Sequence, residues 1–138
     1  MPDNFDVARE VKTVDSLVEH AIDDVSSYQQ DAYRSDTAHL VDELTSLTPQ
    51  QLKETLAAMG AADHGIIRPW STKVGTESVT RDADGNVTGI SFGKDSGIFA
   101  TQIDGTVTVD LMKKSVSTSA WDDFGRPYPP MVSDSSRK

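Results

Sequence analysis

The sequence predicts an α+β protein in which a helical N-terminal half packs on a C-terminal antiparallel β-meander of four to five strands. Apolar residues recur at helical spacing as far as residue 59, and from Gly65 onward the chain is rich in glycine, threonine and β-branched residues that alternate as strands do. A chain of 138 residues suits one domain. We expect three parts: an acidic helical subdomain over 1–66, the meander over 67–121, and an extended or disordered tail over 122–138.

The first helix is indicated by a stripe with successive spacings of 4 and 3, formed by Val7, Val11, Val14, Val18, Ala21, Val25 and Tyr28. Such a stripe fits either a coiled coil with another chain or a helix that packs on its own domain. In a parallel dimer Glu10 would face Asp15 of the other chain, so two acidic groups would meet. Leu17 and Ile22 also widen the stripe, as a globular helix requires. Packing within the chain is therefore favoured, and a small homo-oligomer through this helix is the alternative to a monomer.

Two further helices follow. The segment "TAHLVDELTSL" predicts the second, with an apolar stripe of Leu40, Val41, Leu44 and Leu47. The third begins at "LTPQQL", where Thr48 and Gln51 form a capping box and Pro49 occupies the first helical position. We expect this helix to end at Met59, before Gly60.

The second half predicts antiparallel strands near 76–82, 86–92, 97–103 and 106–112, and a possible fifth near 115–121. Asp104-Gly105 is a preferred two-residue hairpin turn, which would pair the third strand with the fourth. On the fourth strand, Val107 and Val109 would then face the core, and Thr106 and Thr108 the mixed face.

The stretch "VTRDADGNVTGISFG" (79–93) fits either a calcium loop or a hairpin turn. With Gly85 at position 6 of a helical calcium loop, Asp82 and Asp84 become ligands, but Thr80 and Ser91 fall where the first ligand and the bidentate glutamate belong. The hairpin is favoured, and Asp82 and Asp84 are weak metal candidates. The nine residues "DADGNVTGI" also resemble one unit of the tyrosine–aspartate repeats of bacterial surface and toxin shells, which implies hairpin geometry.

The composition excludes several functions. The chain has no cysteine, so it has no disulfide, no thiolate metal site and no cysteine nucleophile. Its net charge of −9 lies in the first half, since residues 1–66 hold 13 acidic and 4 basic side chains. Nucleic-acid binding is disfavoured because this half repels phosphate. Without a long apolar run or a leader peptide, we expect no membrane insertion and a cytoplasmic or leaderless secreted protein.

Few side chains point to catalysis. Asp63, His64 and Arg68 in "ADHGIIRPW" are weak catalytic candidates, because an aspartate can orient a histidine as a general base. His20 and His39 lack the spacing of a helical zinc site. The adjacent pairs Asp23-Asp24, Asp42-Glu43 and Asp122-Asp123 diverge by about 100° on a helix and should not converge. No cofactor site is predicted, and no phosphate-binding glycine loop is present.

These observations favour a small non-enzymatic protein-interaction or assembly module. Its partner would be another protein, with a basic surface if it meets the acidic helices. The candidate contact residues are acidic in the first half (Asp23, Asp24 and Asp31) and aromatic in the tail (Trp121, Phe124 and Tyr128). The alternatives are an acidic inhibitor or nucleic-acid mimic that blocks a basic groove, and a small enzyme that uses His64.

Overall fold

The computed structural model describes residues 5–59, 72–96, 103–122 and 124–134. Three helices precede a five-stranded sheet, as predicted: α1 (Val7–Ser26), α2 (Gln30–Ser46), α3 (Pro49–Met59), β1 (Thr72–Arg81), β2 (Val87–Ser96), β3 (Asp104–Asp110), β4 (Ser115–Trp121) and β5 (Met131–Asp134). The strands follow one another in the order β1-β2-β3-β4-β5, and each neighbouring pair is antiparallel. The α+β class with N-terminal helices and a C-terminal meander is therefore confirmed.

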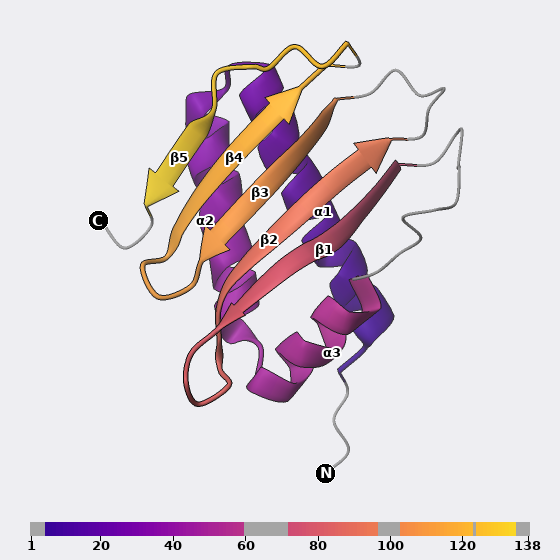
Figure 1. Ribbon diagram of the computed structural model, residues 1–138, viewed down its shortest axis with the longest axis vertical. Coiled ribbons are helices and arrows are strands. Elements are labelled where there is room, and N and C mark those ends of the chain that lie inside the picture. Colours follow the sequence, from indigo (N-terminus) through magenta and orange to yellow (C-terminus); the bar gives the residue numbers. More distant parts are fainter. Residues whose placement is uncertain (1–4, 60–71, 97–102, 123, 135–138) are drawn as a thin grey trace.

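All three helices lie on one face of the sheet (Figure 1). The apolar side chains of that face and those of the helices form a single buried cluster. The helical and β halves therefore share one core. Within the described residues, no element packs on the other face of the sheet, which carries polar side chains such as Thr106, Thr108, Ser117 and Ser119.

The heptad stripe of α1 packs in the core of its own chain. Val14, Val18, Ala21 and Val25 are buried against the sheet and the neighbouring helices, and Ile22 joins them. Burial of these side chains contributes about 1.5 kcal/mol or more for each large one. The apolar stripe that a coiled-coil partner would contact is thus already covered by the sheet and the neighbouring helices. Tyr28, the last member of the stripe, lies beyond the end of the helix.

The start of α3 is as the sequence predicts. The Gln51 N–H donates to Thr48 Oγ1 at 3.1 Å, and the Thr48 N–H donates to Gln51 Oε1 at 3.0 Å. This reciprocal pair satisfies two backbone donors that the first turn cannot bond itself.

No described helix is long and apolar enough to cross a membrane.

The hairpin turn predicted at Asp104-Gly105 is wrong. Both residues lie inside β3, where they pair with Trp121 and Ala120 of β4. A Cβ on residue 105 would stand 2.7 Å from the Ser119 carbonyl and 2.9 Å from a side-chain carbon of Ile22. Glycine is needed here because both β4 and α1 approach closely, so Gly105 is a packing position and not a turn residue. The predicted strand near 97–103 lies outside the described residues except for Ile103.

Side chains of α2 tie the last two strands to the helical layer. The Tyr33 hydroxyl is buried 3.0 Å from Thr118 Oγ1, 3.2 Å from the Val116 carbonyl and 3.1 Å from the Met131 carbonyl. Thr37 Oγ1 lies 2.7 Å from Ser133 Oγ. Through these contacts the tail that the sequence predicts as extended or disordered contributes the edge strand β5.

Candidate functional site

Four aromatic side chains gather at one end of the molecule, which we call the aromatic end: Tyr28, Trp121, Phe124 and Tyr128. Tyr28 comes from the turn between α1 and α2, and the others come from the end of β4 and the segment that leads to β5. In Figure 1 that segment crosses over the ends of α1 and α2. The rings of Tyr28 and Tyr128 meet edge to face with their centroids 6.3 Å apart. This contact joins two segments that are a hundred residues apart in the sequence.

Tyr28 occupies a position that normally belongs to glycine. Its φ is +59°, and its N–H donates to the Val25 carbonyl while the N–H of Gln29 donates to the Asp24 carbonyl. These two bonds form a Schellman motif, whose left-handed residue is usually glycine because a side chain there is strained. The side chain of Tyr28 is 62% exposed. A strained backbone thus holds a large aromatic group in solvent.

The loop after β4 is held by one aspartate. Asp122 Oδ1 accepts from the N–H groups of Phe124 and Arg126, both at 2.9 Å, and Oδ2 accepts from Arg126 Nε at 2.9 Å. These bonds, the Arg126 N–H first among them, hold the pKa of Asp122 below its usual value. The Arg126 guanidinium lies 5.3 Å from the centre of the Phe124 ring. Phe124 is 78% exposed, so the loop presents its aromatic ring to solvent.

The three acidic contact candidates occupy two environments. Asp23 and Asp31 are exposed on either side of the Tyr28 turn, and Asp31 lies 3.8 Å from Arg34. Asp24 instead lies half-buried against Asp36 of α2. Burial, the contact with Asp36, and the charges of Asp36 and Asp23 raise the pKa of Asp24 to about 7. Asp24 therefore belongs to the contact between the two helices.

A second acid pair joins the other ends of the same helices. Burial and the contact with Glu43 raise the pKa of Glu10 to about 7. Among the described residues, no donor reaches Glu10 Oε2 or Asp24 Oδ2, both of which are buried. Two ionised carboxyls cannot bond each other, so each contact becomes a hydrogen bond only when one partner is protonated. Glu43 and Asp24, each a member of an adjacent acidic pair in the sequence, therefore meet a carboxyl from the other helix. Asp123, of the third adjacent pair, lies outside the described residues.

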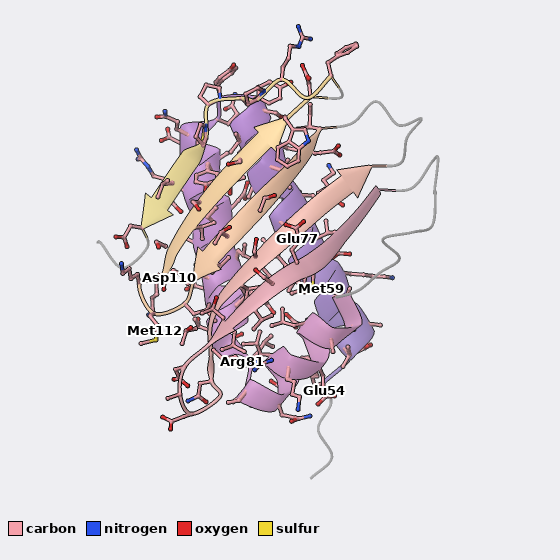
Figure 2. The ribbon with its side chains drawn as sticks, viewed as in Figure 1. Glu54, Met59, Glu77, Arg81, Asp110 and Met112 are labelled. Carbon is pink, nitrogen blue, oxygen red and sulfur yellow. The ribbon has the colours of Figure 1, made fainter. Side chains whose placement is uncertain are left out.

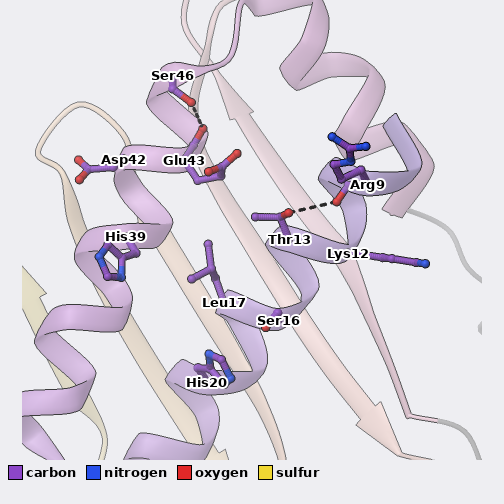
Figure 3. A pocket seen from close by; sticks show the side chains of 10 residues that line it. All are labelled: Arg9, Lys12, Thr13, Ser16, Leu17, His20, His39, Asp42, Glu43 and Ser46. Atoms are coloured by element: carbon purple, nitrogen blue, oxygen red, sulfur yellow. Dashed lines mark hydrogen bonds between the residues drawn. The ribbon is translucent and has the colours of Figure 1, made fainter. Parts of the chain in front are cut away.

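An open groove of about 720 Å³ runs between α1 and α2 on the side away from the sheet (Figure 3). Both His20 and His39 line it, at exposed positions. The hydroxyls of Thr13 and Ser46 bond carbonyls of their own helices, at 3.1 and 2.7 Å. Arg9 and Lys12 on one helix stand with Asp42 and Glu43 on the other, so no single charge dominates. The groove does not favour one class of ligand.

The remaining sequence candidates carry no site in the described part of the chain. Asp63, His64 and Arg68 lie outside the described residues. Asp82 closes the β1–β2 turn, because its Oδ1 accepts from the N–H groups of Asp84 and Asn86 at 2.9 Å and Gly85 has a φ of +87°. The described residues hold no group of three histidine, aspartate or glutamate side chains that could bind a metal.

Sequence reasoning missed two features. It identified Trp121, Phe124 and Tyr128 but could not connect Tyr28 to them, since Tyr28 looked like the last member of a helical stripe. It also missed the carboxyl pairs between helices, for which no local signal exists.

No protein-family model matches the chain, and neither a curated protein nor a solved structure matches it.

Proposed function

We propose that this protein is a small protein-interaction module whose contact surface is the aromatic end. The observation that carries the proposal is Tyr28, an exposed aromatic side chain kept at a left-handed position and packed edge to face on Tyr128. A tyrosine at positive φ has a strain energy of about 1 kcal/mol that glycine would avoid. A strained, exposed aromatic group is typical of a functional position.

The composition of this end suits a protein interface. Tyrosine, tryptophan and arginine are the residues that most often dominate binding energy in such interfaces. Phe124, 78% exposed, is stacked by Arg126, whose guanidinium is in turn held by Asp122. The hydrogen bonds of Asp122 fix the backbone of this loop and the Arg126 side chain, which reduces the entropy lost on binding.

The charge around Tyr28 favours a partner with a basic surface. Asp23 and Asp31 are both exposed beside this turn. Exposed carboxylates at the rim of an interface mainly raise the association rate and add salt dependence. The apolar contact of Tyr28 and Phe124 should persist at high salt. This distinguishes the proposal from an acidic inhibitor or nucleic-acid mimic, whose binding would rest on charge.

The test is quantitative affinity capture from an extract of the source organism. The double variant Tyr28→Ser with Phe124→Ser should lose the partner. The control is Met112→Ser, since Met112 is 75% exposed in the β3–β4 turn at the opposite end of β4 (Figure 2). Thermal unfolding confirms that each variant is folded. Retention of the same partner by the double variant, or complete loss of binding in high salt, would contradict the proposal.

A further inference from the structure

The segment from Arg126 to Pro130, "RPYPP", is stiff by its covalent structure. Pro127, Pro129 and Pro130 have φ fixed near −65° by their rings. Arg126, Tyr128 and Pro129 each precede a proline, which disfavours helical backbone for them. The segment is therefore biased toward extended or polyproline II conformation before any partner binds.

Tertiary contacts fix this segment in place. The Tyr128 N–H donates to the Ala120 carbonyl at 2.9 Å, and Pro127 forms a bridge with Trp121 of β4. The Asp122 carboxylate holds the N-terminal end through Arg126, and β5 continues the chain after Pro130. The segment is thus attached at its start, its middle and its end.

The prolines are turned to solvent while the residue between them is turned inward. Pro127, Pro129 and Pro130 are all exposed, whereas Tyr128 is half-buried and packs on Tyr28 and the core. Pro127 and Pro130 are both exposed and stand three residues apart, the spacing that puts two side chains on one edge of a polyproline II helix. The chain therefore presents a preordered P-x-x-P edge, next to the exposed Phe124 ring.

We propose that the Arg126–Pro130 segment is the element that the partner recognises, and that the partner is a protein domain with an aromatic-lined groove for proline-rich ligands. This inference deepens the proposed function and rests on it. Grooves of this class take proline pairs three residues apart because the ligand loses little entropy on binding. In this protein the fold already restricts the backbone of the segment. Less backbone entropy is therefore lost when a partner binds, which makes association more favourable.

The charges at this end limit the choice of partner further. Arg126 is engaged by Asp122 and Phe124, so it does not need an acidic group from the partner. Asp23 and Asp31 are exposed beside Tyr28, whose ring touches Tyr128 within the segment. The groove should accordingly carry basic side chains on the rim that faces the α1–α2 turn.

The experiment measures binding of the full chain to a panel of purified SH3, WW and EVH1 domains, the three structural classes that use such grooves. At least one domain should bind, and the double variant Pro127→Ala with Pro130→Ala should bind it about tenfold more weakly or worse. Pro49→Ala is the matched control, because Pro49 is also exposed but lies at the start of α3. Its affinity should equal that of the unaltered chain.

Nuclear magnetic resonance of the labelled chain gives a second readout that does not depend on a variant. On addition of the binding domain, the amide signals of Gly125, Tyr128 and Met131 should shift, and those of the β1–β2 turn should not. If no domain in the panel binds, or if the Pro127/Pro130 variant binds as tightly as the unaltered chain, the inference is overturned. The prolines would then serve only to keep the edge of the sheet from pairing with other strands.

Failure here and failure of the proposed function are distinguishable. If the panel fails while the Tyr28/Phe124 variant still loses its captured partner, the aromatic end is an interface but the proline edge is not its ligand. If the captured partner still binds both the Tyr28/Phe124 variant and the Pro127/Pro130 variant, the proposed function is wrong.

Discussion

The carboxyl pair of Glu10 and Glu43 predicts a stability that decreases as the pH rises. Glu10 has an ordinary pKa of 4.5, which burial first and then the contact with Glu43 raise to about 7 in the folded protein. The folded protein therefore holds this proton more tightly than the unfolded chain does. Stability from the pair is fully present below pH 4.5 and is lost as the pH rises through about 7.

The magnitude follows from the shift and from the exposure of the group. At about 1.36 kcal/mol per pH unit, the whole shift would correspond to roughly 3 kcal/mol. Glu10 is partly exposed, so solvent screens the repulsion and the effect on unfolding is reduced to about 1 kcal/mol. In Glu43→Gln the neutral amide can donate to Glu10 at any pH. Burial of Glu10, the largest cause of the shift, is unchanged in this variant, so it should be more stable than the unaltered chain by at most about 1 kcal/mol at pH 8, and equal to it near pH 4.5.

Urea unfolding followed by circular dichroism at pH 4.5 and 8, at constant ionic strength, measures this difference. Asp36→Asn should behave in the same way, since it removes the carboxyl that faces Asp24. Asp42→Asn is the control, because it removes one negative charge from the same helix outside both pairs. The reasoning is refuted if Asp42→Asn stabilises the protein equally, or if Glu43→Gln gives the same gain at both pH values.

Three further substitutions test the fold. Tyr33→Phe removes the one O–H that donates to the Val116 or the Met131 carbonyl, so unfolding should become easier by about 1–3 kcal/mol and the β5 amides should exchange faster with deuterium; unchanged exchange would contradict this role. Gly105→Ala should destabilise the protein by about 2 kcal/mol in urea unfolding, because its Cβ would lie 2.7 Å from the Ser119 carbonyl; a neutral result would mean that α1 can move away. Tyr28→Gly relieves backbone strain but removes a ring contact of similar energy, so the melting temperature should change by about 3 °C or less. Partner capture should be lost. A large fall in melting temperature would instead make Tyr28 a structural residue.

Local sequence signals account for most of the elements. The apolar stripe of α1 and the capping box at Thr48 and Gln51 predict helices because they depend on neighbours within one turn. Alternation along 106–109 predicts which side of β3 is buried, and Val107 and Val109 are indeed in the core. Turn chemistry predicts the β1–β2 hairpin, where Gly85 has positive φ. Each of these properties is fixed by residues close together in the chain.

The same kind of signal fails where a contact between distant segments gives a residue its role. Asp104-Gly105 has the local chemistry of a turn, but the approach of Ile22 makes Gly105 a packing position within a strand. The tail has the composition of an extended segment, yet Tyr33 and Thr37 provide partners that hold β5 in the sheet.

The sequence by itself determined the helical and β halves, the concentration of negative charge in the first, and the aromatic residues and prolines near the end of the chain. Only the tertiary structure decided that Tyr28 meets Tyr128, that Asp24 faces Asp36 and Glu10 faces Glu43, and that the prolines of "RPYPP" point outward. The physical reason is that periodicity, capping and turn propensity act over a few residues, whereas these contacts depend on how α1 crosses α2 and on which side of β4 the chain returns.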